Sequence, residues 1–294
     1  MATIPRVVHC IWIQGEAALE ASRDWWPKHR AAWAALMPRW KVRIWEDATI
    51  RPLLREHYPK LLRLYDAPGA PMAWKADVAR YALVHRHGGM YADITYEVLR
   101  NFDWILAGKG VDMVYVMHDV TATERELFAP VNNCWFAATP QHEVLARVID
   151  ALGDARVPRT FDGNTVTNTT GPHALWRGLR PLVSQPNLRA IPALALDPFV
   201  ASGSYVACDS ADDCRARLPA TVALHRSQQS YQTGFEKLAY GGIIFVKRNY
   251  ISCTLVFLLL LVIVGLSLAL WGRHHRLARR ACEATCPVAT ARRA

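Results

Sequence analysis

The first hundred residues alternate between patterns typical of strands and patterns typical of helices. Residues 4–14 carry a β-branched and aromatic run, Val-Val-His-Cys-Ile-Trp-Ile, which predicts a buried strand. Large apolar residues at helical spacing predict a helix over residues 17–36. Residues 40–45 alternate apolar and basic side chains and predict a second strand, and Asp47 can cap the helix that follows. This order of elements predicts an α/β sheet with covered faces.

A helix pattern then begins near residue 72 and ends at a pair of glycines. Apolar residues form a stripe along the predicted helix, at Trp74, Val78 and Tyr81. Asp77 and Arg80 lie three positions apart, so they share one face of this helix. Gly88-Gly89 then ends the helix, because glycine adopts the left-handed conformation that many helix C-termini need.

The segment after the glycines, residues 90–99, has the pattern of a strand. Its polar side chains Asp93, Thr95 and Glu97 recur at a spacing of two and would therefore share one face of that strand. In α/β sheets, ligands bind outside the carboxyl ends of the strands. We therefore expect these side chains to lie at or near a ligand site.

The remaining pattern continues the same fold and then ends in a long apolar run. Further strands are predicted at 112–117 and 132–138, and helices at 141–152 and 171–179. Residues 182–224 are irregular, with short strands. We take residues 1–240 as one α/β domain, followed by a linker over 241–250.

Residues 251–271 contain no charged side chain and are rich in Leu, Val, Ile and Phe. A helix of this length measures about 31 Å, the thickness of a bilayer core, so we expect a transmembrane helix. The alternative is a buried core helix, which is rarely apolar on every side over this length. Residues 272–294 would form a short basic tail.

Charge is concentrated at the C-terminal end. The net charge is +10, but residues 247–294 hold eight Lys/Arg and one acidic residue, which leaves +3 for residues 1–246. A nucleic-acid-binding domain carries its basic surface on the folded part, so no nucleic-acid partner is expected. Basic residues beside an apolar helix suit a membrane surface instead.

The side of the membrane stays open at this stage. The basic tail favours a cytoplasmic C-terminus by the positive-inside rule, whereas a tail anchor inserted after synthesis would have the opposite orientation. Cys208 and Cys214 could close a small loop, and Asn168-Thr169-Thr170 is a glycosylation sequon. Unpaired buried cysteines and an unused sequon are the alternatives.

The polar residues singled out above suit one kind of chemistry. Carboxylate and hydroxyl oxygens, as at Asp93, Thr95 and Glu97, are ligands for Mg²⁺ or Mn²⁺. Asp77 could accept hydrogen bonds from a ribose, and Arg80 could bind a phosphate. His225, in a polar segment before the apolar run, could return to the site as a metal ligand. The plainer alternatives are an ordinary helix ion pair and a structural histidine.

Taken together, these segments resemble a known family. The similarity is strongest in the segments Ile4–Trp12, Trp45–Asp47, Lys75–Tyr81 and Gly88–Asp93. It is looser at Asn132-Asn133, at Thr170-Pro172 and at His225. In this order and spacing they are similar to the DXD-motif glycosyltransferases, which include α-1,6-mannosyltransferases and inositol phosphoceramide mannosyltransferases. The resemblance covers residues 4–105 well. It implies a GT-A fold, Mn²⁺ or Mg²⁺, a nucleotide-sugar donor and retention at the anomeric carbon.

The resemblance also implies roles for individual residues. The donor would be bound by Trp12, Asp77, Arg80, Tyr91, Asp93 and Thr95. Asp93 would be the first carboxylate of the DXD motif and Asn132 would face the donor sugar or the acceptor, and both are expected to be catalytic. The metal ligands would be Asp93, Glu97 and His225. A cation there would offset charge on the leaving diphosphate.

One position departs from the family pattern, because the second Asp of the motif is Thr95. Three outcomes stay open: a metal site rebuilt around Asp93, Glu97 and His225, a weak or metal-independent enzyme, or a sugar-nucleotide-binding pseudoenzyme. A metal-dependent hydrolase or phosphotransferase is a further alternative, but it lacks a nucleophile or a second cluster of carboxylates.

The leading hypothesis is a membrane-anchored hexosyltransferase. The donor would be GDP-mannose or a UDP-sugar and the acceptor a lipid or glycan, with inositol phosphoceramide among the lipids. An endomembrane of the Golgi or endoplasmic reticulum type would be the location in a eukaryotic or viral system.

Overall fold

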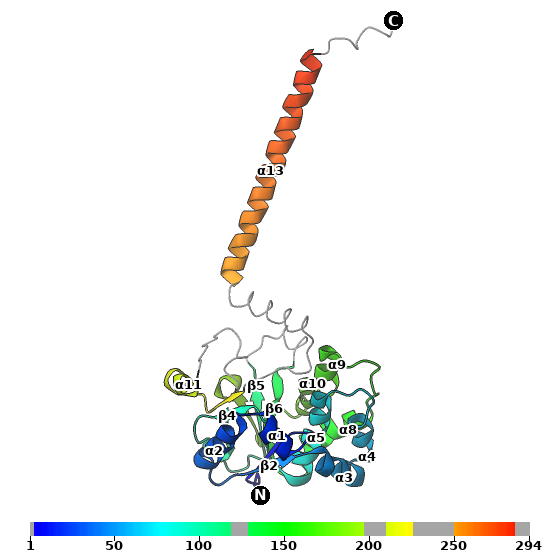
Figure 1. Cartoon of the computed structure of the whole chain (residues 1–294), viewed down its shortest axis with the longest axis vertical. Coiled ribbons are helices and arrows are strands. Elements are labelled where there is room, and N and C mark those ends of the chain that lie inside the picture. Colours follow the sequence, from blue (N-terminus) through cyan, green and yellow to red (C-terminus); the bar gives the residue numbers. More distant parts are fainter. Residues whose placement is uncertain (1–2, 119–128, 197–209, 226–249, 286–294) are drawn as a thin grey trace. The chain divides into compact units, whose positions relative to one another are not determined.

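A computed structural model describes residues 3–118, 129–196, 210–225 and 250–285 (Figure 1). The chain divides into two compact units, Met1–Lys237 and Leu238–Ala294. The finer division expected around the apolar run stays a prediction.

The first unit alternates strands and helices, as its sequence predicts. Its strands are β1 (Val7–Ile11), β2 (Lys41–Trp45), β3 (Gly89–Ala92), β4 (Tyr96–Val98), β5 (Met113–Met117), β6 (Val131–Ala138), β7 (Leu188–Pro192) and β8 (Ala223–His225). Its helices are α1 (Glu16–Ser22), α2 (Trp26–Leu36), α3 (Asp47–His57), α4 (Pro59–Tyr65), α5 (Met72–His87), α6 (Asp103–Leu106), α8 (Glu143–Gly153), α9 (Gly163–Thr169), α10 (Pro172–Leu179) and α11 (Ala211–Arg217), with the 3-10 turn η1 (Ala193–Ala195).

Six of these strands form one mixed sheet in the order β2-β1-β3-β6-β5-β7. β1 pairs in parallel with β2 and with β3, and β5 pairs in parallel with β7. β6 runs antiparallel to both of its neighbours, β3 and β5. The expected α/β class is confirmed. Because β1 and β3 are parallel, their carboxyl ends lie at the same edge of the sheet, and β6 begins at that edge.

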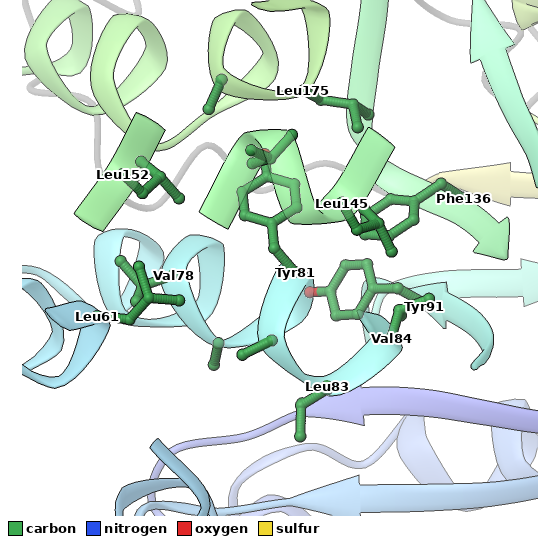
Figure 2. Close-up of a cluster of buried hydrophobic side chains, with 14 of the residues drawn as sticks. Leu61, Val78, Tyr81, Leu83, Val84, Tyr91, Phe136, Leu145, Leu152 and Leu175 are labelled. Carbon is green, nitrogen blue, oxygen red and sulfur yellow. The ribbon is translucent and has the colours of Figure 1, made fainter. Parts of the chain in front are cut away.

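Helices lie on both faces of the sheet, with α3, α4, α5 and α8 on one side and α2 on the other (Figure 1). Buried apolar side chains form a core on each of these two sides. Figure 2 shows the first of these cores, where Tyr81 of α5 and Tyr91 of β3 lie beside Phe136 of β6. The Tyr81 and Phe136 rings are stacked, with their centroids 5.8 Å apart and 20° between their planes. This packing anchors α5, which carries two of the predicted site residues, directly on the sheet.

The predicted strand over residues 90–99 is wrong in its length. β3 ends at Ala92, and residues 93–95 form a turn in which the Tyr96 amide donates to the Asp93 carbonyl at 3.0 Å. β4 then pairs with β8 in a separate two-stranded sheet. Asp93, Thr95 and Glu97 therefore do not share the face of one strand.

The predicted helix over residues 17–36 is also divided, into α1 and α2. α2 has a proline in its first turn, where the missing amide hydrogen costs nothing, whereas in a continuous helix that proline would break an internal hydrogen bond.

The described part of the second unit is a single helix, α13 (Tyr250–Thr285). Among the described residues, no helix is both long enough and apolar enough to cross a bilayer. The side chains of residues 251–256 and 258 lie outside the described part. The transmembrane helix expected over 251–271 is therefore not confirmed and stays a prediction.

The structure describes one of the two cysteines that could close a small loop, and it describes the glycosylation sequon. Cys214 on α11 is buried and disulfide-bonded, whereas Cys208 lies outside the described residues. Asn168 is exposed at the end of α9, and the hydroxyl of Thr170, the third residue of its sequon, is buried.

Candidate functional site

Three elements of the sheet deliver polar groups to one edge. Trp12 follows the last residue of β1, and its backbone amide donates to the Trp45 carbonyl at 2.9 Å. Asp93 follows the last residue of β3, which runs parallel to β1. Cys134 of the antiparallel β6 lies beside it, because the Asp93 amide donates to the Cys134 carbonyl at 2.9 Å. The strand ends thus form the site that the α/β pattern predicts.

Asp77 and Arg80 on α5 form a buried ion pair. Arg80 Nη2 lies 2.9 Å from Asp77 Oδ1, and the two side chains are 6% and 8% exposed. The same Asp77 oxygen accepts from Asn133 Nδ2 at 2.8 Å, and Asp77 Oδ2 accepts from the Thr170 hydroxyl at 3.0 Å. Asp77 and Arg80 thus form the (i, i+3) helix ion pair considered as the alternative, although this pair is buried. Their role in donor binding stays a prediction.

Arg80 also connects the helix to the strand ends. Its Nη1 donates to the Asn133 carbonyl at 2.7 Å and lies 3.5 Å from Asp93 Oδ1. Its guanidinium carbon lies 4.5 Å from the centre of the Tyr91 ring. One buried cation therefore faces both carboxylates, Asp77 and Asp93.

Asp93 is held on both oxygens but keeps contact with solvent. Tyr91 donates its hydroxyl to Asp93 Oδ1 at 2.6 Å, on the same oxygen that Arg80 approaches. His225 Nε2 lies 3.4 Å from the other oxygen, Oδ2. The Asp93 side chain is 28% exposed. A ligand could therefore reach this carboxylate from outside.

The pKa values of Asp77 and Asp93 are shifted in opposite directions. Burial raises the pKa of Asp77, and Arg80 and the hydrogen bonds described above oppose it only in part. Burial would also raise the pKa of Asp93, but Arg80, His225 and Tyr91 outweigh it and lower the pKa below the usual value. Asp93 is therefore ionised at neutral pH and can act as a cation ligand.

His225 reaches the site through the small sheet. It stands opposite Tyr96 in the β4–β8 register, and the two rings are stacked with centroids 4.7 Å apart. The Tyr96 hydroxyl lies 3.3 Å from the sulfur of Cys134. Within the described residues, Asp93, Cys134 and His225 form a group that could hold a metal ion, with their ligand atoms all within 4.8 Å of one another.

The structure thus brings together two of the expected metal ligands, Asp93 and His225. The third member of the group is Cys134, in place of the expected Glu97. Glu97 is 7% exposed on β4 and does not belong to this group. Thr95 is half-buried in the turn after Asp93. The metal role of Glu97 and the donor-binding role of Thr95 stay predictions.

Asn132 and Trp12 keep buried polar atoms for which the described residues supply no hydrogen-bond partner. Asn132 is 8% exposed, and neither the oxygen nor the nitrogen of its amide is paired there. The indole nitrogen of Trp12 is likewise buried and has no hydrogen-bond partner among the described residues. An unpaired buried polar group is costly, so a ligand that bonds to these atoms would recover part of that free energy.

Three residues at this edge make contacts that the sequence alone does not predict. Asn133 and Thr170 bind Asp77, and Cys134 joins the possible metal ligands. The available signal was the looser family resemblance at Asn132-Asn133 and Thr170-Pro172, which indicated the segments but not what each side chain contacts.

Part of the chain, including the segment that carries these polar residues, is similar to known proteins. Residues 24–112 match the model described as "Glycosyltransferase sugar-binding region containing DXD motif". An uncharacterized glycosyltransferase of Acanthamoeba polyphaga mimivirus is 28% identical over 57% of this chain and 61% of that protein. Inositol phosphoceramide mannosyltransferase 3 of Schizosaccharomyces pombe is 24% identical over 62% of this chain and 47% of that protein.

The chain thus spans about half the length of the curated relatives it matches. Among solved structures, the PaToxG glycosyltransferase aligns with 61% of this chain and 69% of its own, at 16% identity and a TM-score of 0.44. The match over residues 24–112 includes Asp77, Arg80 and Asp93, so the segment that carries these residues is similar to the sugar-binding region of the DXD-motif glycosyltransferases.

Proposed function

We propose that this chain is a GT-A glycosyltransferase that moves a hexose from a nucleotide-sugar donor to a lipid or glycan acceptor. Mannose is the favoured sugar, and inositol phosphoceramide is one of the acceptors to consider, because relatives from Schizosaccharomyces pombe carry the name inositol phosphoceramide mannosyltransferase. GDP-mannose is accordingly the first donor to test, with UDP-sugars second.

The position of Asp93 carries this proposal. It is an ionised, partly exposed carboxylate at the carboxyl end of β3, inside the region that matches the sugar-binding family. Arg80 and Tyr91 hold one of its oxygens, which leaves the other directed towards His225. This arrangement supports binding of a cation that in turn binds a diphosphate.

Each polar residue of the site has a separate role in this proposal. Asp93 would hold the cation, with Arg80 and Tyr91 fixing the orientation of its carboxylate. Trp12 would contact the nucleotide, and Asn132 would bond to the donor sugar or the acceptor through its unpaired amide. The resemblance implies Mn²⁺ or Mg²⁺ as the cation and retention at the anomeric carbon. Once bound, a divalent cation supplies charge stabilisation for the leaving diphosphate.

Membrane anchoring belongs to the same proposal. An anchor over residues 251–271, with the linker 241–250 before it and the basic tail 272–294 after it, would keep the enzyme beside a lipid acceptor. In a eukaryotic or viral system, the proposed location is an endomembrane of the Golgi or endoplasmic reticulum type.

One observation favours a second candidate function. Thr95 replaces the second carboxylate of the DXD motif, and a hydroxyl is a poorer cation ligand than a carboxylate. The chain would then bind a nucleotide sugar without transferring it. Donor-dependent thermal stabilisation in the absence of turnover, with activity conferred by Thr95→Asp, would support this pseudoenzyme.

A transfer assay tests the main proposal. The full chain in detergent is incubated with GDP-mannose or UDP-sugars, with inositol phosphoceramide or glycan acceptors, and with Mn²⁺, Mg²⁺ or chelator. We expect cation-dependent transfer that Asp93→Asn abolishes, whereas Asp24→Asn, which alters an exposed carboxylate, keeps it. Absence of both transfer and donor hydrolysis with every donor and cation would refute the enzyme.

A further inference from the structure

The group of possible metal ligands contains a thiol, which hard-cation sites do not use. Asp93 contributes a carboxylate oxygen from the turn after β3, Cys134 a sulfur from β6, and His225 a ring nitrogen from β8. Mg²⁺ prefers six oxygen ligands, whereas thiolate and imidazole together suit Zn²⁺ and Co²⁺. We propose that Asp93, Cys134 and His225 form a tetrahedral site selective for a thiophilic divalent cation such as Zn²⁺.

The separation of the ligand atoms fits this geometry. Zn²⁺ binds nitrogen and oxygen at about 2.0–2.2 Å, so two such ligands in a tetrahedron lie roughly 3.3–3.5 Å apart. His225 Nε2 and Asp93 Oδ2 lie 3.4 Å apart. Zinc–sulfur bonds are longer, about 2.3 Å, and all three ligand atoms already lie within 4.8 Å of one another. In a tetrahedral site the sulfur lies roughly 3.6 Å from each of the other two ligand atoms, so an approach of at most about 1.2 Å completes three corners.

Neighbouring side chains already orient the three ligands. Tyr96 contacts two of them, since its ring stacks on His225 and its hydroxyl lies 3.3 Å from the Cys134 sulfur. Tyr91 donates to Asp93 Oδ1, which directs Oδ2 towards His225. Such outer contacts position metal ligands and raise the affinity of a metal site.

Binding would convert the Cys134 thiol into a thiolate, so one proton is released for each cation bound. Three protein ligands leave one corner of the tetrahedron open, which is the arrangement of catalytic rather than structural zinc. A phosphate oxygen of the donor could occupy that corner. This last role rests on the proposed function, whereas the metal site itself stands on the three ligands.

Cobalt spectroscopy on the chelator-treated full chain tests the proposal. We expect one Co²⁺ per chain at this site, the strong visible bands of tetrahedral cobalt, a thiolate-to-cobalt charge-transfer band in the near ultraviolet, and displacement by Zn²⁺ but not by Mg²⁺. Cys134→Ser should remove the charge-transfer band and weaken Co²⁺ binding at least tenfold. Cys10→Ser is the matched control, because Cys10 is also buried but lies outside the ligand group, and it should retain both properties.

Persistence of the charge-transfer band in Cys134→Ser, or displacement by Mg²⁺ as readily as by Zn²⁺, would overturn the proposal. If Cys134→Ser fails to fold, His225→Gln provides the second test, because it should keep the charge-transfer band but lose tetrahedral visible absorption and affinity. The two proposals fail separately. A chain with the cobalt spectrum but without sugar transfer refutes only the enzyme, and transfer supported by Mg²⁺ without the cobalt site refutes only this inference.

Discussion

His9 on β1 is held as a neutral imidazole, and acid should therefore destabilise the fold through this residue. Its Nε2 lies 2.8 Å from the Gly88 carbonyl, and its Nδ1 accepts from the Trp45 indole at 2.9 Å. Because an indole nitrogen can only donate, Nδ1 carries no hydrogen and Nε2 donates to Gly88. If Nδ1 were protonated, its N–H would face the indole N–H of Trp45, and neither donor would have an acceptor. His9 is only 1% exposed, so water could not take that role.

The size of the effect follows from the pKa of His9. Burial, with smaller contributions from His87 and Arg43, lowers this pKa from 6.5 to about 4 against the opposing bond to Gly88. Between pH 4 and pH 6.5, His9 is largely protonated in the unfolded chain but largely neutral in the folded chain. The stabilising contribution is therefore complete above pH 6.5 and is lost as the pH falls towards 4. From pH 7.5 to 4.5 the loss is about 2.5 kcal/mol.

Urea unfolding of wild type and His9→Gln at several pH values, followed by tryptophan fluorescence, measures this loss. Glutamine cannot take up the proton, so the difference in unfolding free energy between the two proteins should shrink by about 2.5 kcal/mol as the pH falls from 7.5 to 4.5. His275→Gln, an exposed change in the second unit, should follow wild type. A difference that stays constant within about 0.5 kcal/mol would refute the reasoning.

Three further changes test the core and the site by thermal or urea unfolding. Arg80→Met removes the cation from a buried pair and leaves Asp77 uncompensated, so it should cost about 3–5 kcal/mol. Gly89→Ala should cost about 1–3 kcal/mol, because Gly89 has φ +99° and an added Cβ would lie 2.6 Å from the Val7 carbonyl oxygen. Phe136→Ala should cost about 3–5 kcal/mol, since this ring is completely buried in the core of Figure 2.

Each change has a control of the same chemical kind. Arg55→Met alters an exposed arginine on α3, and Trp104→Ala alters a side chain that is 65% exposed. Gly69→Ala introduces a Cβ at a positive φ with open space around it, so it should be milder than the change at Gly89. Equal effects within any of these pairs would contradict the packing or contact assigned to the buried member.

Much of the fold was predictable because its signals are local. The apolar stripe of α5 and the glycines after it lie within one segment, and the spacing of Asp77 and Arg80 places them on one helical face. The parallel strand ends follow from the alternation of strands and helices, so the position of Asp93 near a ligand edge was predictable as well.

What could not be predicted depends on contacts between distant segments. Residues 90–99 have the continuous alternation of one strand, and no glycine or proline marks the turn after Ala92. Pairing of β4 with β8 divides that strand, and the same pairing brings His225 to Asp93. In the sequence, Cys134 looks like one more apolar residue of a buried strand. Only the folded structure shows that it lies near His225.

Thr95 therefore has a different meaning from the one it has in the sequence alone. If Asp93, Thr95 and Glu97 lined one strand face, loss of the middle carboxylate would remove a metal ligand from a row of three. Asp93 instead lies where β6 and β8 deliver a sulfur and a nitrogen, and Thr95 lies in the turn that follows. A hard-cation site would depend on a carboxylate at position 95, whereas a thiophilic site depends on Cys134. The distinction between an active transferase and a donor-binding relative consequently depends on which cation occupies this edge of the sheet.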